Sequence, residues 1–160
     1  MDAEAKKKAL RSITYGLYVL GAADGDEVAA ATVTWLSQAS FNPPLIMAAL
    51  KKDSHLHDLI LRTRTFTANT VGEGQKEIAA AFFRGARQER GRLNGHAFER
   101  GPATGGPLLT DLPFWLEARL TDVVDRGDHT VVVAEVIEAG VRDPNAMPLS
   151  LRDTEWNYGG

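Results

Sequence analysis

The sequence predicts a mainly β fold, a β-barrel with a few peripheral helices, built as a single domain over residues 1–160. A length of 160 residues is the usual size of one domain, and a composition of 44% hydrophobic and 24% charged residues is typical of a folded globular protein. Several short runs alternate in polarity or are rich in β-branched residues, as strands are. Segments with helical spacing are few and do not alternate regularly with these runs, which favours a barrel over an α/β sheet.

The first third of the chain predicts a leading helix followed by a β-hairpin. Residues Asp2–Ser12 are good helix formers without Gly or Pro, and predict a short, solvated helix. An alternating strand begins at Ile13 and runs to about Leu20. The Asp-Gly pair inside the turn Ala23–Asp26 is a strong hairpin signal, and the return strand Glu27–Trp35 carries mostly small residues.

The middle of the chain predicts two strands and two helices. The continuous apolar run Leu45–Leu50 predicts a strand that is buried on both faces. Asp53 or Ser54 is expected to cap a helix, because the apolar residues that follow have helical spacing. A strand is expected over Phe66–Val71, and a second helix over about Gln75–Phe83.

The last third predicts a long excursion and a final pair of strands. Residues 84–110 are rich in Arg and Gly and are expected to form a mobile excursion. Alternation over Phe114–Thr121 and the apolar run Thr130–Val136 predict two strands, joined by a turn over Asp125–Asp128.

Composition excludes several classes of site and partner. Cysteine is absent, which excludes disulfides, iron–sulfur clusters and zinc–thiolate sites, so that electron transfer would need a bound organic cofactor. A net charge of -3 gives no reason to expect nucleic acid or an anionic membrane as a partner. His55 and His57 would point in different directions on a helix, so we expect no metal site. The polar N-terminus and the lack of a membrane-spanning run lead us to expect a cytoplasmic protein.

Five segments, in family order, resemble the flavin reductase-like, FMN-binding split-barrel family, with the flavoredoxin, ferric reductase and short-chain flavin reductase types as the nearest in appearance. They are SITYGLYVL (12–20), TVTWLSQASFNPPLIMAALKKDSHLHDLI (32–60), FTANTV (66–71), TGGPLLTD (104–111) and GDHTVVVAEV (127–136). The resemblance implies a split barrel that forms a homodimer and holds FMN, or FAD, at the barrel edge near the subunit interface.

The same resemblance implies an NAD(P)H-dependent flavin reductase that passes hydride from NADH or NADPH to the flavin. An oxygenase or a rubredoxin-like protein is the acceptor that it suggests. Two alternatives stay open at this point: a flavoredoxin-like electron carrier, and a non-catalytic split-barrel protein that binds flavin or haem.

One stretch offers the small, polar surface that a flat isoalloxazine needs. Thr32 and Thr34 are two apart on a predicted strand, which places their side chains on one face. The alternative is an ordinary strand whose Thr hydroxyls are satisfied within the protein. The predicted cofactor-binding residues of this stretch are Thr32, Thr34, Trp35, Leu36, Ser37, Gln38 and Ser40.

A predicted helix start offers a site for the flavin phosphate. Lys51, Lys52 and Ser54 bracket this start, where free backbone N–H groups and the helix dipole attract anions. The alternative is a capped surface helix with solvated lysines.

Three further features are candidates for the site. His129 stands where a tight turn enters a strand, and the resemblance implies that it lies near flavin and nicotinamide, where it would position the hydride donor; a structural histidine is the alternative. Trp156 belongs to an aromatic tail that would cover the flavin or a partner subunit, unless the terminus frays. The arginines of residues 84–100 would clamp phosphates of NAD(P)H or ADP, or form a solvated, salt-bridged loop.

Overall fold

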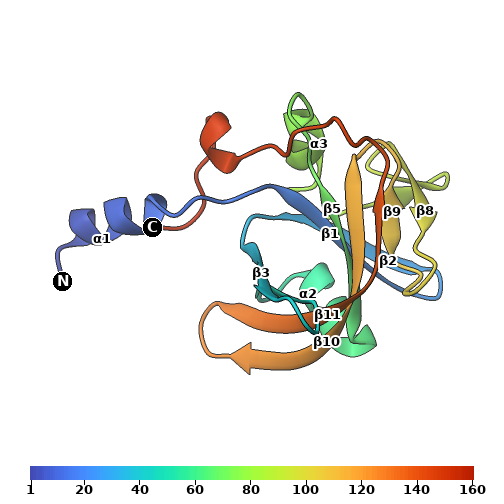
Figure 1. Ribbon diagram of the computed structural model, residues 1–160, viewed down its shortest axis with the longest axis horizontal. Coiled ribbons are helices and arrows are strands. Elements are labelled where there is room, and N and C mark those ends of the chain that lie inside the picture. The colour runs from blue at the N-terminus through green and yellow to red at the C-terminus, as the bar shows by residue number, and fades with distance from the viewer.

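The computed structural model describes residues 1–160 and is built on a seven-stranded antiparallel sheet (Figure 1). The mainly β fold is therefore confirmed. The sheet curls around a core, but its two edge strands do not pair with one another, so that hydrogen bonds do not close it into a full barrel. In spatial order the strands are β2 (Glu27–Val33), β1 (Tyr18–Asp24), β5 (Thr65–Thr70), β10 (Phe114–Asp125), β11 (His129–Val141), β4 (Leu45–Lys51) and β3 (Leu36–Ser40).

The two edge strands, β2 and β3, follow one another directly in the chain. Only Thr34 and Trp35 connect them, and the Ala49 N–H donates to the Trp35 carbonyl at 2.9 Å, which ties this link to β4. The open side of the sheet therefore lies where the chain turns from one edge to the other.

Within the stretch 84–110, which was expected to be a mobile excursion, residues 88–109 form a second, four-stranded sheet. The sheet buries Leu93, Leu108 and Leu109 against the main body. Two buried side chains of β5, Thr67 and Asn69, donate to the Pro107 carbonyl at 2.7 and 3.2 Å. Its strands are β6 (Gln88–Glu89), β7 (Arg92–Leu93), β8 (His96–Arg100) and β9 (Pro107–Leu109).

Three helices and one 3-10 turn, η1 (Leu151–Asp153), complete the chain. Helix α1 (Ala3–Arg11) has no buried residue and projects from the body beside the C-terminus (Figure 1). Helix α2 (His55–Thr63) is capped by Ser54, one of the two predicted caps, and covers the core of the main sheet. Helix α3 (Lys76–Ala81) is short and ends against β2. No helix is both long and apolar enough to cross a membrane.

The structure corrects three sequence-based expectations, two of which concern strand boundaries. The first strand begins at Tyr18 rather than Ile13, because residues 13–17 leave the sheet and only Gly16 bridges to Ser150. The return strand ends at Val33, where the chain turns toward β3.

The third correction concerns β4, which was expected to be buried on both faces. Ile46, Ala48 and Leu50 face the core, whereas Met47 on the outer face is 45% exposed. The apolar run is therefore buried on one face only within a single chain.

Candidate functional site

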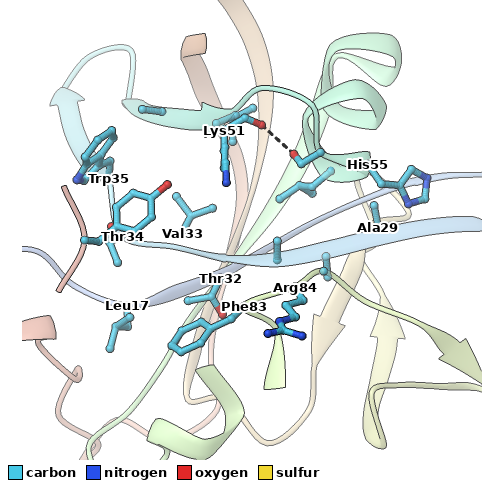
Figure 2. A pocket seen from close by; sticks show the side chains of 18 of the residues that line it. Leu17, Ala29, Thr32, Val33, Thr34, Trp35, Lys51, His55, Phe83 and Arg84 are labelled. Atoms are coloured by element: carbon cyan, nitrogen blue, oxygen red, sulfur yellow. Dashed lines mark hydrogen bonds between the residues drawn. The ribbon is translucent and has the colours of Figure 1, made fainter. Parts of the chain in front are cut away.

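A cavity of about 920 Å³ lies along the open edge of the sheet (Figure 2). Its walls come from β2, the link to β3, the end of β4, the start of α2, the turn after α3, and the C-terminal tail. This volume is near the upper end of the range of about 300–1,000 Å³ that is usual for small-molecule sites. The cavity therefore has room for a large ring system with its attached groups.

The β2 wall is small and partly polar. Ala29, Ala30 and Ala31 present no side chain larger than a methyl group to the cavity, and β2 has no strand partner on its outer edge. The Thr32 hydroxyl donates to the Ala79 carbonyl at 2.7 Å, so this hydroxyl is satisfied within the protein.

Thr34 differs from Thr32 because its hydroxyl has no partner. The residue is 7% exposed and lines the cavity, and its Oγ1 makes no hydrogen bond. The Nε1 of the adjacent Trp35 is likewise buried and unpaired. A buried polar group without a partner costs about 1–3 kcal/mol, so two such groups beside one cavity favour a polar ligand there.

An aromatic cluster surrounds Trp35 at one end of the cavity. The Trp35 ring lies 4.6 Å from the His129 ring and 5.1 Å from the Tyr158 ring, centroid to centroid. His129 is held at both nitrogens, with Nδ1 2.8 Å from an Asp128 carboxylate oxygen and Nε2 2.7 Å from the Tyr158 hydroxyl. His129 itself does not line the cavity and reaches it through Trp35 and Tyr158, which do.

Two pKa shifts reflect this arrangement. The hydrogen bond and the charge of His129 hold the pKa of the Asp128 carboxyl below its usual value. Burial, together with the negative charge of Asp128, raises the pKa of the Tyr158 hydroxyl. At neutral pH the tail tyrosine is therefore a neutral hydrogen-bonding group and Asp128 is a carboxylate that orients the imidazole.

The opposite end of the cavity meets the start of α2. Ser54 Oγ accepts from the His57 N–H at 3.1 Å and donates to the Lys51 carbonyl at 2.9 Å, a bond drawn in Figure 2. Lys52 pairs with Asp125, which lowers the pKa of that carboxyl. Lys51 forms no ion pair, although its charge is a minor cause of the lowered pKa of Asp128, and its side chain points into the cavity (Figure 2).

The cavity collects most of the residues that sequence reasoning selected. Four others, on β3, do not line it, because the turn at Thr34–Trp35 leads that strand away to pair with β4. These four are Leu36, Ser37, Gln38 and Ser40. The selected residues that line the cavity are Thr32, Thr34, Trp35, Lys51, Lys52, Ser54 and Trp156.

Sequence reasoning missed Phe83 on the cavity wall, and it named Arg84 and Tyr158 only as members of longer stretches. Phe83 packs edge-to-face on Trp156 with ring centroids 4.7 Å apart, Arg84 follows it, and Tyr158 hydrogen-bonds His129. The signals available were the aromatic tail and the arginine-rich stretch. Neither signal indicates which member faces the cavity, because that depends on how α3 docks on β2.

Comparison with known proteins places the chain in a family. Residues 10–158 match the family model described as flavin reductase like domain. The chain is 34% identical over 110 residues to the NADH:riboflavin 5'-phosphate oxidoreductase of Streptomyces pristinaespiralis. This alignment covers 69% of the chain and 61% of the relative. It is 32% identical over 141 residues to the NADPH-flavin oxidoreductase of Streptomyces viridifaciens, covering 87% and 72%.

A solved structure gives the same relationship. The flavin reductase of the styrene monooxygenase of Pseudomonas putida S12 superposes with a TM-score of 0.72 and 28% identity, over 86% of this chain and 87% of that one. The chain spans less than two thirds of the length of several curated relatives that it matches, down to 24% and 42% of two of them.

Proposed function

Because the chain belongs to the flavin reductase-like domain family, we propose that it is an NAD(P)H-dependent flavin reductase, which transfers hydride from NADH or NADPH to FMN or FAD. The observation that carries the proposal is the pair of unpaired polar groups, Thr34 Oγ1 and Trp35 Nε1, buried beside a cavity with a small-residue wall. The flavin would supply the redox chemistry, and the protein would bind it, orient the donor and exclude water.

The residues present fit a flavin. The alanines of β2 leave space for a flat ring, and Thr34 and Trp35 offer hydrogen bonds that nothing else in the protein uses. Lys51 and the free N–H groups at the start of α2 suit the phosphate. Ser54 and Lys52 would support the phosphate site without being free to bind the phosphate themselves. Ser54 caps the helix, and Lys52 is paired with Asp125.

His129 is proposed to position the nicotinamide. Hydride transfer needs two rings held close together and no general base, so the role of His129 is geometric. Asp128 fixes the orientation of its ring, and Tyr158 occupies its outward nitrogen. Trp156 and Tyr158 are proposed to cover the reacting rings and keep water away.

A flavoredoxin-like carrier is the second candidate. The C-terminal tail favours it, because residues 156–158 line the cavity and would slow the exchange of bound flavin. An absorbance spectrum of the purified protein, followed by anaerobic addition of NADH or NADPH, tests both. A reductase bleaches bound or added flavin with NADH or NADPH. A yellow protein that neither nucleotide reduces contradicts the proposed reductase and supports the carrier.

We further propose that the protein is a homodimer and that reduced flavin, or its electrons, pass to an oxygenase or a rubredoxin-like acceptor. The outer face of β4 and β11 is apolar: Met47 and Val133 are cross-strand partners there, and so are Ala49 and Val131. A second copy of the chain would cover this face and bury β4 on both sides, as the sequence pattern predicts. Light scattering tests it, since a 17.4 kDa monomer that still binds flavin would contradict the dimer.

A further inference from the structure

Arg84 is a second cation on the cavity wall that has no acidic partner. Its side chain lines the cavity and takes part in no ion pair or hydrogen bond within the chain. Figure 2 shows Arg84 and Lys51 on opposite sides of β2, with Phe83 beside Arg84. A single phosphate that binds Lys51 would therefore leave Arg84 free.

The backbone around Arg84 is fixed in place. The Phe82 carbonyl accepts from the Thr32 N–H at 3.1 Å and from the Gly85 N–H at 3.2 Å. With the bond from the Thr32 hydroxyl to Ala79, these contacts anchor the turn after α3 to the free edge of β2.

Asn94 holds the same turn from the other side. Its side-chain amide donates to the carbonyls of Ala81 and Gly85 at 2.7 and 2.9 Å, and its side-chain oxygen accepts from the Arg87 N–H at 2.8 Å. Residues on both sides of Arg84 are thus bonded to β2 or to the small sheet. The guanidinium is presented from a preorganised turn, which lowers the entropic cost of binding an anion.

The other arginines of this stretch are placed differently. Arg92 donates to the Gly95 carbonyl, and Arg87 and Arg90 do not line the cavity. A free guanidinium beside a cavity is suited to bidentate recognition of phosphate oxygens.

We propose that Arg84 binds the diphosphate of an adenine dinucleotide in this cavity. The inference rests on the proposed function and assigns it a second anion site. Since Lys51 serves the flavin phosphate on the other side of β2, the diphosphate that Arg84 meets is that of NADH or NADPH rather than of FAD. The cavity volume is compatible with a flavin and part of a second nucleotide.

The test compares Arg84→Ala and Arg84→Lys with Arg87→Ala, a matched control three residues along the chain. Equilibrium titration with ADP, which carries the diphosphate and the adenosine but no nicotinamide, is the readout that does not depend on activity. Arg84→Ala should weaken ADP binding about tenfold, as expected for loss of a charge-assisted contact, and Arg84→Lys should restore part of it. Equal ADP affinity in Arg84→Ala and Arg87→Ala would overturn the proposal.

Two further arms identify the dinucleotide. Arg84→Ala should raise the apparent dissociation constant of NADH about tenfold and leave that of reduced nicotinamide mononucleotide unchanged. A loss confined to FAD, with FMN unchanged, would still place a diphosphate at Arg84 but would overturn its assignment to the hydride donor. Riboflavin binding by the parent protein, and reduction of flavin by NADH in its presence, test the proposed function separately, since neither depends on the Arg84 comparison.

Discussion

At the scale of single residues, two buried threonines of similar environment do opposite things. Thr67 donates to the carbonyls of Gly21 and Pro107, whereas Thr34 donates to nothing. A satisfied buried hydroxyl stabilises the fold, and an unsatisfied one costs free energy until a ligand pairs with it. The unpaired Thr34 hydroxyl is therefore the one of the two that a ligand in the cavity could pair with.

This contrast predicts opposite effects of one substitution at the two positions. Thr34→Val should leave the free energy of unfolding unchanged or raise it by up to about 1 kcal/mol, because it removes an unpaired hydroxyl, and should weaken flavin binding. Thr67→Val should lower the free energy of unfolding by about 1–3 kcal/mol, because it removes the hydroxyl that donates to the buried carbonyls of Gly21 and Pro107. Denaturant titrations and flavin fluorescence measure both. Weaker folding in Thr34→Val with unchanged flavin affinity would show that the Thr34 hydroxyl is structural.

His129 allows a second prediction at this scale. His129→Ala should slow reduction of the flavin by NADH at least tenfold, because a misplaced hydride donor loses rate steeply, while flavin affinity changes little. Stopped-flow absorbance separates the rate from the affinity. Tyr158→Phe is the matched control, since it removes only the hydroxyl that meets His129 Nε2. An unchanged rate in His129→Ala, or loss of flavin with a large fall in Tm, would make His129 a structural residue.

At the scale of elements, one buried carboxylate holds the loop that precedes β9. Glu117 of β10 is fully buried and accepts from the Ala103 N–H at 3.1 Å, the Thr104 N–H at 2.8 Å and the Thr104 hydroxyl at 2.6 Å. A Cβ at Gly101 would clash with the Glu117 carboxylate, so a side chain there would displace the carboxylate from the loop. The carboxylate thus attaches the second sheet to the first.

Glu117→Gln should lower the free energy of unfolding by about 1–3 kcal/mol. The amide keeps one acceptor oxygen but turns an N–H₂ group toward a backbone donor, which leaves that donor buried and unpaired. Thermal unfolding measures the loss. Glu135→Gln is the control, because its ion pair with Arg119 is on the surface and should cost under about 1 kcal/mol. Equal Tm values for the two variants would contradict this role of Glu117.

Elements that rest on local signals were predictable from the sequence, and those that rest on distant contacts were not. The Asp-Gly hairpin and the Ser54 cap are set by neighbouring residues, and both formed as predicted. The sheet of residues 88–109 has strands of two to five residues and depends on Thr67, Asn69 and Glu117, which lie elsewhere in the chain.

The candidate site follows the same division. The small-residue strand and the Lys51 helix start were visible as patterns and line one cavity. The exit of β3 from the cavity and the entry of Arg84 into it depend on tertiary turns, and no periodicity signals either of them.

At the scale of the whole molecule, one apolar surface has no counterpart within the chain. On the outer face of the sheet, Met47 of β4 is 45% exposed and Val124 of β10 is 48% exposed, with Val131 and Val133 of β11 between them. Helix α1 likewise projects from the body without a buried residue (Figure 1). Contiguous exposed apolar surface in a folded protein indicates an interface.

Met47→Glu should therefore convert the proposed homodimer into a monomer while the fold persists. The side chain already points away from the core, so a carboxylate there costs the monomer little, whereas two carboxylates buried across a two-fold interface repel and lose their hydration. Light scattering measures the mass and thermal unfolding checks the fold. Val141→Glu, at the far end of β11 and 63% exposed, is the control and should leave the mass unchanged. A parent and a Met47→Glu variant of the same dimeric mass would show that the subunits meet through another face, and α1 would then be the element to test next.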